Sequence, residues 1–87
     1  MKVRFFGSPN CKDCAEVFIL LNKFNLEYDY IDVTDEDDEI QDFCDYHEVE
    51  ELPHLQFMIE DNIILQHVGQ LKEEELVGYL TDYFPNY

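Results

Sequence analysis

Two hydrophobic periodicities alternate along this chain of 87 residues, and their order limits the folds that it can adopt. Segments rich in aromatic and β-branched residues predict strands at 2–6, 27–33, 55–59 and 63–68. Helical spacing of apolar residues predicts one helix over 12–24, a second after Thr34 and a third that Pro85 ends. The predicted order of elements is therefore β-α-β-α-β-β-α.

The connections between these segments decide which strands are parallel. A helix between the first two strands makes them parallel through a right-handed crossover. Only Glu60, Asp61 and Asn62 separate the last two strands, so this pair must be antiparallel. The sequence therefore predicts an α/β architecture with a four-stranded mixed sheet and three helices. A chain of this length is expected to form a single domain over 1–87.

The second and third predicted helices each turn one face to the core. Thr34 is expected to cap the second helix, since the acidic Asp37 follows three positions later. The core-facing side of that helix has the spacing i, i+3, i+4, i+7 and carries Ile40, Phe43, Cys44 and His47. The corresponding side of the third helix carries Leu76, Tyr79, Leu80 and Tyr83. Tyr28 and Tyr30, at strand period, are also expected in the core.

The charge of the chain narrows its possible partners. It has 21 acidic residues against 5 basic ones, a formal net charge of −16. Nucleic acids and anionic membranes both bind clustered Lys and Arg, so neither is expected as a partner. The acidic surface either keeps the protein soluble or steers it toward a basic patch on a partner protein, and both interpretations stay open.

Two observations bear on the cellular compartment in which the protein is expected. No apolar run approaches the roughly 18 residues of a membrane span, and segment 1–10 turns polar too early for a secretory signal. A cytoplasmic protein is therefore expected. Structural disulfides are rare in that compartment, so the Cys-x-x-Cys motif of Cys11 and Cys14 is expected to be catalytic or metal-binding.

The motif lies between the first strand and the first helix, which gives its two thiols different surroundings. Cys11 precedes the helix, where the dipole and the unpaired backbone N–H groups favour thiolate over thiol. Cys14, one turn inside, is expected to be more shielded. Cys11 is therefore predicted to attack a substrate disulfide, and Cys14 to resolve the mixed disulfide that forms. Lys12 and Asp13, between them, affect the thiolate with opposite signs.

Three segments resemble a known family: FFGSPNCKDC at 5–14, EELPHLQF at 50–57 and HVGQLKEEEL at 67–76. With them the chain resembles the thioredoxin superfamily, and within it the small glutaredoxin-like proteins. The resemblance implies a thioredoxin fold and dithiol–disulfide oxidoreductase activity. It also implies that no cofactor is bound and that reducing equivalents come from glutathione or from a reductase.

The same resemblance assigns further residues to a substrate site. Pro53 matches the family's cis-proline, which faces the Cys-x-x-Cys motif, and Leu52 matches the residue whose backbone pairs with the substrate. Gly69 matches the glycine that follows the last strand. Together with Lys12, these residues form the expected substrate-binding set.

The chain departs from the glutaredoxin pattern in ways that bear on its substrate. Lys12 and Asp13 replace the usual proline and aromatic residue, and Glu51 replaces the threonine of the cis-proline motif. No basic residue stands just before Cys11, where glutaredoxins often place a lysine for the glutathione carboxylate. These departures favour a protein disulfide as substrate, on a partner with a basic docking patch, in the manner of the small electron donors to ribonucleotide reductase. The protein is expected to act as a monomer.

A zinc site is the competing interpretation. Cys44 and His47 could add two ligands to Cys11 and Cys14 and complete a tetrahedral set. Against this, Cys44 and His47 share the core-facing side of the second helix, where a free cysteine packs as a small hydrophobe. A buried structural Cys44 is therefore expected, with a regulatory thiol as the alternative. A non-catalytic acidic module that binds proteins is the remaining alternative for the whole chain.

The two other histidines have weaker assignments. His54 follows the expected cis-proline and is predicted either as an ordinary residue at the rim of the active site or as a proton-transfer group. His67 lies in the last predicted strand, where packing is the expected use.

Overall fold

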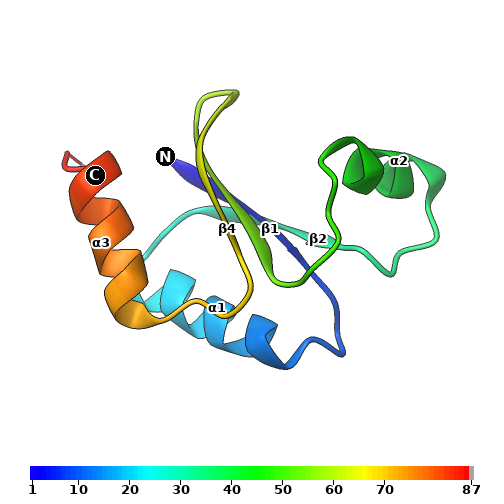
Figure 1. Ribbon diagram of the computed structural model, residues 1–87, viewed down its shortest axis with the longest axis horizontal. Coiled ribbons are helices and arrows are strands. Elements are labelled where there is room, and N and C mark those ends of the chain that lie inside the picture. The colour runs from blue at the N-terminus through cyan, green and yellow to red at the C-terminus, as the bar shows by residue number, and fades with distance from the viewer. Residues whose placement is uncertain (87) are drawn as a thin grey trace.

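The computed structural model describes residues 1–86, and its elements follow the predicted order (Figure 1). The strands are β1 (Lys2–Gly7), β2 (Tyr28–Asp32), β3 (His54–Ile59) and β4 (Asn62–Val68). The helices are α1 (Lys12–Lys23), α2 (Asp38–Tyr46) and α3 (Glu73–Tyr83). Residues 1–86 thus have the predicted α/β architecture, a four-stranded sheet with three helices. Within this range no helix has both the length and the apolarity of a membrane span.

The strand order in the sheet is β2-β1-β3-β4. Strands β1 and β2 are parallel, while β3 is antiparallel to both β1 and β4. This confirms the predicted crossover through α1 and the predicted hairpin of β3 and β4. Because successive side chains of a strand alternate between faces, Val3 and Phe5 lie on one face of the sheet and Arg4 and Phe6 on the other.

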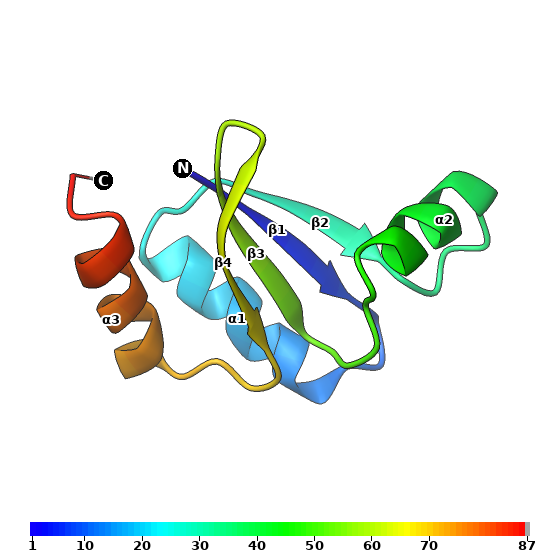
Figure 2. The same cartoon turned by 45° about the horizontal axis from the view of Figure 1, so that its top comes forward.

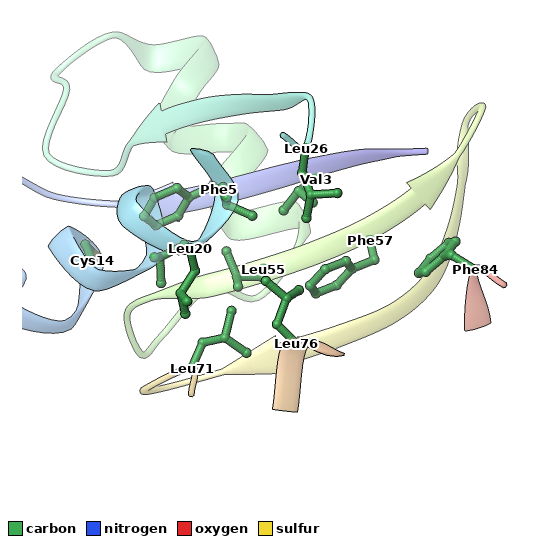
Figure 3. Packing of buried hydrophobic residues seen from close by; sticks show 12 residues of the cluster. Val3, Phe5, Cys14, Leu20, Leu26, Leu55, Phe57, Leu71, Leu76 and Phe84 are labelled. Atoms are coloured by element: carbon green, nitrogen blue, oxygen red, sulfur yellow. The ribbon is translucent and has the colours of Figure 1, made fainter. Parts of the chain in front are cut away.

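The hydrophobic core lies between one face of the sheet and helices α1 and α3 (Figures 1 and 3). Its buried side chains come from the strands, from both helices and from the loops, and are Val3, Phe5, Cys14, Val17, Leu20, Leu21, Leu26, Leu55, Phe57, Leu71, Leu76 and Phe84. Full burial of one large apolar side chain contributes roughly 1.5–3 kcal/mol. The first turn of α1, which carries Cys14, is therefore held against β1 by the core itself.

The opposite face of the sheet packs against α2 and is partly polar. Phe6 stacks on Phe43 of α2 with ring centroids 5.9 Å apart, and the guanidinium carbon of Arg4 lies 4.9 Å from the centre of the Phe43 ring. Gln56 of β3 is buried; its Oε1 accepts from Nη1 of Arg4 at 2.8 Å, and its Nε2 donates to Nδ1 of His47 at 3.1 Å. These contacts attach the end of α2 to the sheet.

The expected cap of α2 is wrong, because the helix starts later than its sequence pattern indicates. Asp37 is the N-cap, and its Oδ1 accepts from the backbone N–H groups of Glu39 at 2.9 Å and Ile40 at 3.3 Å. Thr34 instead donates from both its backbone N–H and its hydroxyl to Oδ1 of Asp32. This turn at the end of β2 keeps the chain out of the helix until Asp37.

The expected core face of α3 is correct for three of its residues and wrong for the fourth. Leu76 is buried, and Tyr79 and Leu80 pack against the core, but Tyr83 is 50% exposed. The C-cap residue Phe84, 5% exposed, occupies the core position instead, with its ring centroid 6.3 Å from that of Phe57. The helix ends at Tyr83, and the backbone then turns the next ring inward.

Candidate active site

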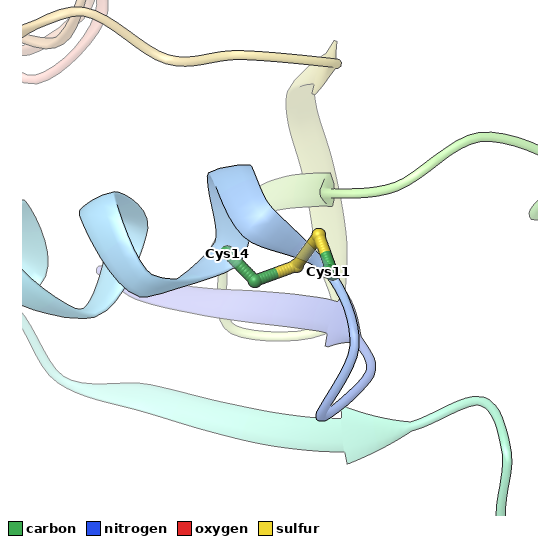
Figure 4. Close-up of a disulfide and its surroundings, with 2 residues drawn as sticks. All are labelled: Cys11 and Cys14. Carbon is green, nitrogen blue, oxygen red and sulfur yellow. A yellow bond between two sulfur atoms is a disulfide. The ribbon is translucent and has the colours of Figure 1, made fainter.

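Cys11 and Cys14 lie at the junction of β1 and α1 (Figure 4). Cys11 is the N-cap of α1 with an extended backbone (φ −83°, ψ 108°), and Cys14 lies in the first turn. The two sulfur atoms form a disulfide bond, with the Cα atoms 5.3 Å apart. Cys11 is partly exposed, whereas only 2% of Cys14 is exposed. A partner can therefore reach Cys11 more readily than Cys14.

The N-terminal end of α1 favours a negative charge on Cys11. The side chain of Cys11 makes no capping hydrogen bond, and the first backbone N–H groups of a helix have no acceptor within it. Lys12 is exposed and pairs with no carboxylate among residues 1–86, while Asp13 adds an opposing charge in the first turn. In the reduced protein, the helix end and the Lys12 ammonium both stabilise a thiolate at this position.

The Leu52–Pro53 peptide bond is cis and lies just before β3. In the antiparallel pair of β1 and β3, Phe6 pairs with His54. Pro53, the preceding residue, is therefore level with Gly7, from which the chain leads to Cys11. Figure 2 shows the loop after β1 and the segment before β3 at the same end of the sheet. Leu52 is half-buried and packs against the same core as Cys11.

Gly69 connects the segment after β4 to the cis-proline. Its φ of +93° is a conformation that glycine adopts without steric cost, and its N–H donates to the Pro53 carbonyl at 2.8 Å. The segment around Gly69 is held by His67. Its Nδ1 accepts from the Tyr79 hydroxyl at 2.6 Å, and its Nε2 donates to the Gln70 carbonyl at 2.9 Å. The structure thus brings two segments of the expected substrate set into direct contact.

Two acidic cavities open near the motif. The larger, about 620 Å³, is lined by Tyr30, Ile31, Asp32, Asp35, Asp37, Glu39, Ile40 and Phe43. Because Gly7 pairs with Asp32 in the parallel strands, this cavity lies at the same sheet end as the loop to Cys11. The smaller, about 250 Å³, is lined by Glu48, Glu50, Glu51, His54 and Val68, on the side of the cis-proline. Carboxylates therefore gather at this end of the sheet, beside the end of β2 and beside the end of β4.

His54 lines the smaller acidic cavity but is itself buried. It is 6% exposed, its ring contacts the ring of Phe6 with centroids 5.5 Å apart, and its Nε2 donates to Oε1 of Gln66 at 2.7 Å. Gln56 also donates to this oxygen, at 3.2 Å. Two buried polar residues of β3 thus share one acceptor on β4. No proton-transfer use of His54 is visible in these contacts.

Cys44 and His47 do not join the Cys-x-x-Cys motif. Cys44 is buried, as its sequence pattern predicts, and burial followed by the charge of Asp45 raises the pKa of its thiol. His47 faces Arg4 and Gln56 on the sheet face opposite the core that holds Cys14. Within the described residues, no three His, Cys, Asp or Glu side chains lie close enough together to hold a metal ion.

The hydrogen-bonded network of His54, Gln56 and Gln66 behind the site was not among the features predicted from the sequence. His54 and Gln56 alternate along β3 with the core residues Leu55 and Phe57, so a strand with two buried faces carries a polar stripe on one of them. That alternation is visible in the sequence and indicates a polar network under α2. The close packing at Gly7 was also not predicted, because a glycine after a strand is usually interpreted only as the residue that ends the strand.

Comparisons with known proteins agree with this geometry. A sequence model of the glutaredoxin family, described as Glutaredoxin, matches residues 3–57. No curated protein sequence matches the chain. Among solved structures, thioredoxin 1 from Thermosipho africanus TCF52B superposes with a TM-score of 0.75 at 17% identity, over 98% of this chain and 96% of that one. Thioredoxin f2 from Chlamydomonas reinhardtii gives 0.78 at 12% identity, over 99% and 81%.

A third structure, a mutant thioredoxin from Halobacterium salinarum NRC-1, gives a TM-score of 0.76 at 20% identity, covering 94% of this chain and 73% of that one. Likenesses at such low identity establish the thioredoxin fold. The family match covers more than half of the chain and includes both cysteines and the cis-proline. The chain therefore belongs to the glutaredoxin family, the thioredoxin-fold thiol–disulfide oxidoreductases.

Proposed function

We propose that this protein reduces a disulfide bond of a partner protein through Cys11 and Cys14. The observation that carries the proposal is the difference between the two sulfurs: Cys11 caps α1 and is partly exposed, while Cys14 is buried one turn away. A nucleophile must meet the substrate, whereas a resolving thiol needs to reach only the nucleophile.

The reaction transfers two electrons in two exchange steps. The Cys11 thiolate attacks one sulfur of the partner's disulfide, so a mixed disulfide forms and the other partner sulfur leaves as a thiolate. The Cys14 thiolate then attacks Cys11 Sγ, which breaks the mixed disulfide and releases the second partner thiolate. The partner ends reduced, and this protein ends with the Cys11–Cys14 disulfide that its structure contains. Glutathione or a reductase then restores the dithiol.

The substrate set supports an extended partner segment next to Cys11. Leu52 supplies backbone groups ahead of β3, Pro53 shapes that side of the site, and the Gly69 N–H bond to Pro53 holds the two together. Lys12, exposed and unpaired within residues 1–86, is available to a carboxylate or carbonyl of the partner. No bound cofactor enters this chemistry.

The partner carries a basic docking patch. The formal charge of −16 and the two acidic cavities at the motif's end of the sheet support this choice, because they attract a cationic surface and repel the glutathione anion. A monomer that donates electrons to one protein, in the manner of the small donors to ribonucleotide reductase, fits these features. The cytoplasm, where thiols are kept reduced, is the corresponding compartment.

Two serine variants test the function with a disulfide-containing protein such as insulin as substrate and glutathione plus its reductase as donor. Cys11→Ser is expected to abolish reduction and to trap no partner, because the nucleophile is lost. Cys14→Ser is expected to accumulate the mixed disulfide, seen by mass. Cys44→Ser is the matched control and should retain wild-type activity, since Cys44 is buried on α2. Wild-type behaviour of both Cys11→Ser and Cys14→Ser would exclude the reaction.

A further inference from the structure

Gly7, the last residue of β1, lies where three side chains converge. A Cβ atom placed on it would lie 2.9 Å from Sγ of Cys14, 3.0 Å from Cε1 of Tyr30 and 3.1 Å from Cε1 of Phe5. Real Cβ atoms essentially never approach a neighbour to less than 3.0 Å. Because Gly7 has no side chain, the sulfur of Cys14 can pack close to its backbone, where a Cβ atom would otherwise lie.

The requirement for glycine at this position comes from space and not from the backbone. Gly69 is the glycine with a positive φ within residues 1–86, so Gly7 has a conformation open to any residue. Its N–H and carbonyl groups follow the parallel pairing with β2, and its carbonyl accepts from the Val33 N–H at 2.9 Å. Nothing in this arrangement excludes alanine except the contacts of its Cβ.

Of the three neighbours, Phe5 has the least freedom to move, whereas Tyr30 is 38% exposed and is held by its ring contacts. Phe5 is fully buried, and its ring contacts those of Phe18 and Tyr30 with centroids 4.8 and 5.2 Å apart. Phe18 and Tyr30 also contact each other at 5.0 Å. These three rings form a packed wall beside Gly7. A side chain added at position 7 would therefore act first on Sγ of Cys14, which is the nearest of the three atoms at 2.9 Å.

The two redox forms respond differently to such a displacement. In the disulfide form, Cys14 Sγ is held in place by its bond to Cys11, with the Cα atoms 5.3 Å apart. In the dithiol form, that bond is absent and Sγ can rotate about Cα–Cβ to another staggered position. A side chain at position 7 thus opposes the disulfide more than the dithiol.

We infer that Gly7 is a positioning residue that sets the equilibrium between the dithiol and disulfide forms of Cys11 and Cys14. Its open space lets Cys14 Sγ occupy the site from which it bonds to Cys11, so the disulfide is favoured and the dithiol is a stronger reductant. The inference rests on the redox pair of the proposed function. It adds a determinant of the potential that lies outside the Cys-x-x-Cys motif.

The test compares Gly7→Ala with Gly78→Ala in glutathione redox buffers, reading the Cys11–Cys14 disulfide by alkylation and mass. Gly78 lies in α3, and a Cβ there would meet nothing within 4 Å, so it controls for the same chemical change. Gly7→Ala is expected to lower the equilibrium constant for disulfide formation about tenfold, a shift of ~30 mV to a less negative potential. Gly78→Ala should keep the wild-type midpoint.

Urea unfolding of each redox form separates a redox effect from a general loss of stability. Gly7→Ala should destabilise the oxidised form more than the reduced form, by the same free energy as the shift of the redox equilibrium. An unchanged midpoint, a shift to a more negative potential or equal destabilisation of both forms would overturn the inference. So would failure of the reduced variant to give a native circular dichroism spectrum, because the conflict is specific to the disulfide.

The same measurements distinguish this inference from the proposed function. If the wild-type protein forms the disulfide but reduces no protein substrate, the function fails while the Gly7 shift remains measurable. If the wild-type protein reduces insulin and Gly7→Ala leaves the midpoint in place, the function stands and the inference fails. If no Cys11–Cys14 disulfide forms in the wild type, both fail together.

Discussion

At the scale of single residues, the three cysteines differ in how readily a partner can reach them. Cys11 is partly exposed at the positive end of α1, Cys14 is buried behind it, and Cys44 is buried on the far side of the sheet with a raised pKa caused by burial and Asp45. Since the thiolate is the reactive form, only Cys11 combines access with a favourable field. The assignment of nucleophile and resolving thiol follows from these environments, and the variants above test it.

His47 provides a pH dependence at the same scale. Its surroundings oppose a positive charge: burial, then the charges of Arg4 and His54, lower its pKa from the ordinary 6.5. Its contact with Gln56 agrees, because the Gln56 amide donates to Nδ1 and a protonated ring could not accept this hydrogen bond. The folded protein therefore stays unprotonated at His47 at a pH where the unfolded chain already binds the proton.

Stability is expected to fall as the pH drops below about 6.5, because the unfolded state then gains a proton that the folded state resists. Above that pH the contribution of His47 is fully present. His47→Asn keeps an acceptor near Nδ1 and removes the titration. The free energy of unfolding of this variant in urea, measured from pH 7.5 to pH 5.5, should therefore depend less steeply on pH than that of the wild type. Equal slopes would show that His47 does not titrate differently in the two states.

At the scale of elements, helix α2 is the one whose start depends most on a single side chain. It has nine residues, too few for stability on its own, so its cap and its contacts with the sheet must hold it. Asp37 accepts two backbone N–H bonds at its start, and Phe43 and His47 attach it to Phe6 and Gln56. Glu39, one carboxylate of the larger acidic cavity, lies on this helix, and Asp37, another, is its cap.

Asp37→Ala is expected to destabilise the protein by about 1 kcal/mol, the usual cost of losing an N-cap. Asp37→Asn retains the accepting oxygen and should lose much less. Thr34→Ala is the matched comparison, because Thr34 is the cap that the sequence pattern indicates and yet it bonds to Asp32. The free energies of unfolding of the three variants in urea show whether Asp37 or Thr34 caps α2. A larger loss for Thr34→Ala than for Asp37→Ala would contradict the structure.

At the scale of the whole molecule, the charge of −16 acts beyond any single contact. Exposed charges interact over about 30 Å at 0.01 M salt but only about 8 Å at 0.15 M. The two acidic cavities place part of this charge at the end of the sheet from which the chain leads to Cys11. Attraction of a basic partner should therefore depend on salt, whereas the exchange chemistry itself should not.

Two disulfide peptides, one with lysines and one with glutamates next to the cystine, measure this effect. The kcat/KM for the lysine peptide is expected to fall by roughly threefold or more between 0.01 and 0.15 M NaCl, while that for the glutamate peptide rises. The double variant Asp35→Asn and Glu39→Gln removes charge from the larger cavity without altering the Asp37 cap, and should weaken the preference. Equal rates for both peptides at low salt would show that the negative charge does not steer substrates and serves only to keep the protein soluble.

The order of elements, the parallel and antiparallel pairings and the position of Cys11 and Cys14 could all be predicted from the sequence. Periodicity and turn residues act within a few neighbouring positions, so short segments of the sequence are enough to predict the features that depend on them. The cis bond at Pro53 and the match of Gly69 were expected only through the family resemblance, because most bonds before proline are trans.

The start of α2 depends on which of two nearby side-chain hydrogen bonds forms, and the other remaining features depend on residues that are distant in the chain. Asp37 displaces Thr34 as the cap because Asp32, at the end of β2, binds Thr34 first. Phe84 replaces Tyr83 in the core because Phe57 of β3 lies beneath it. The space at Gly7 exists because β1, β2 and α1 bring Phe5, Tyr30 and Cys14 to one point. Local pattern places the two cysteines of this glutaredoxin, and packing between elements decides how their sulfurs are held.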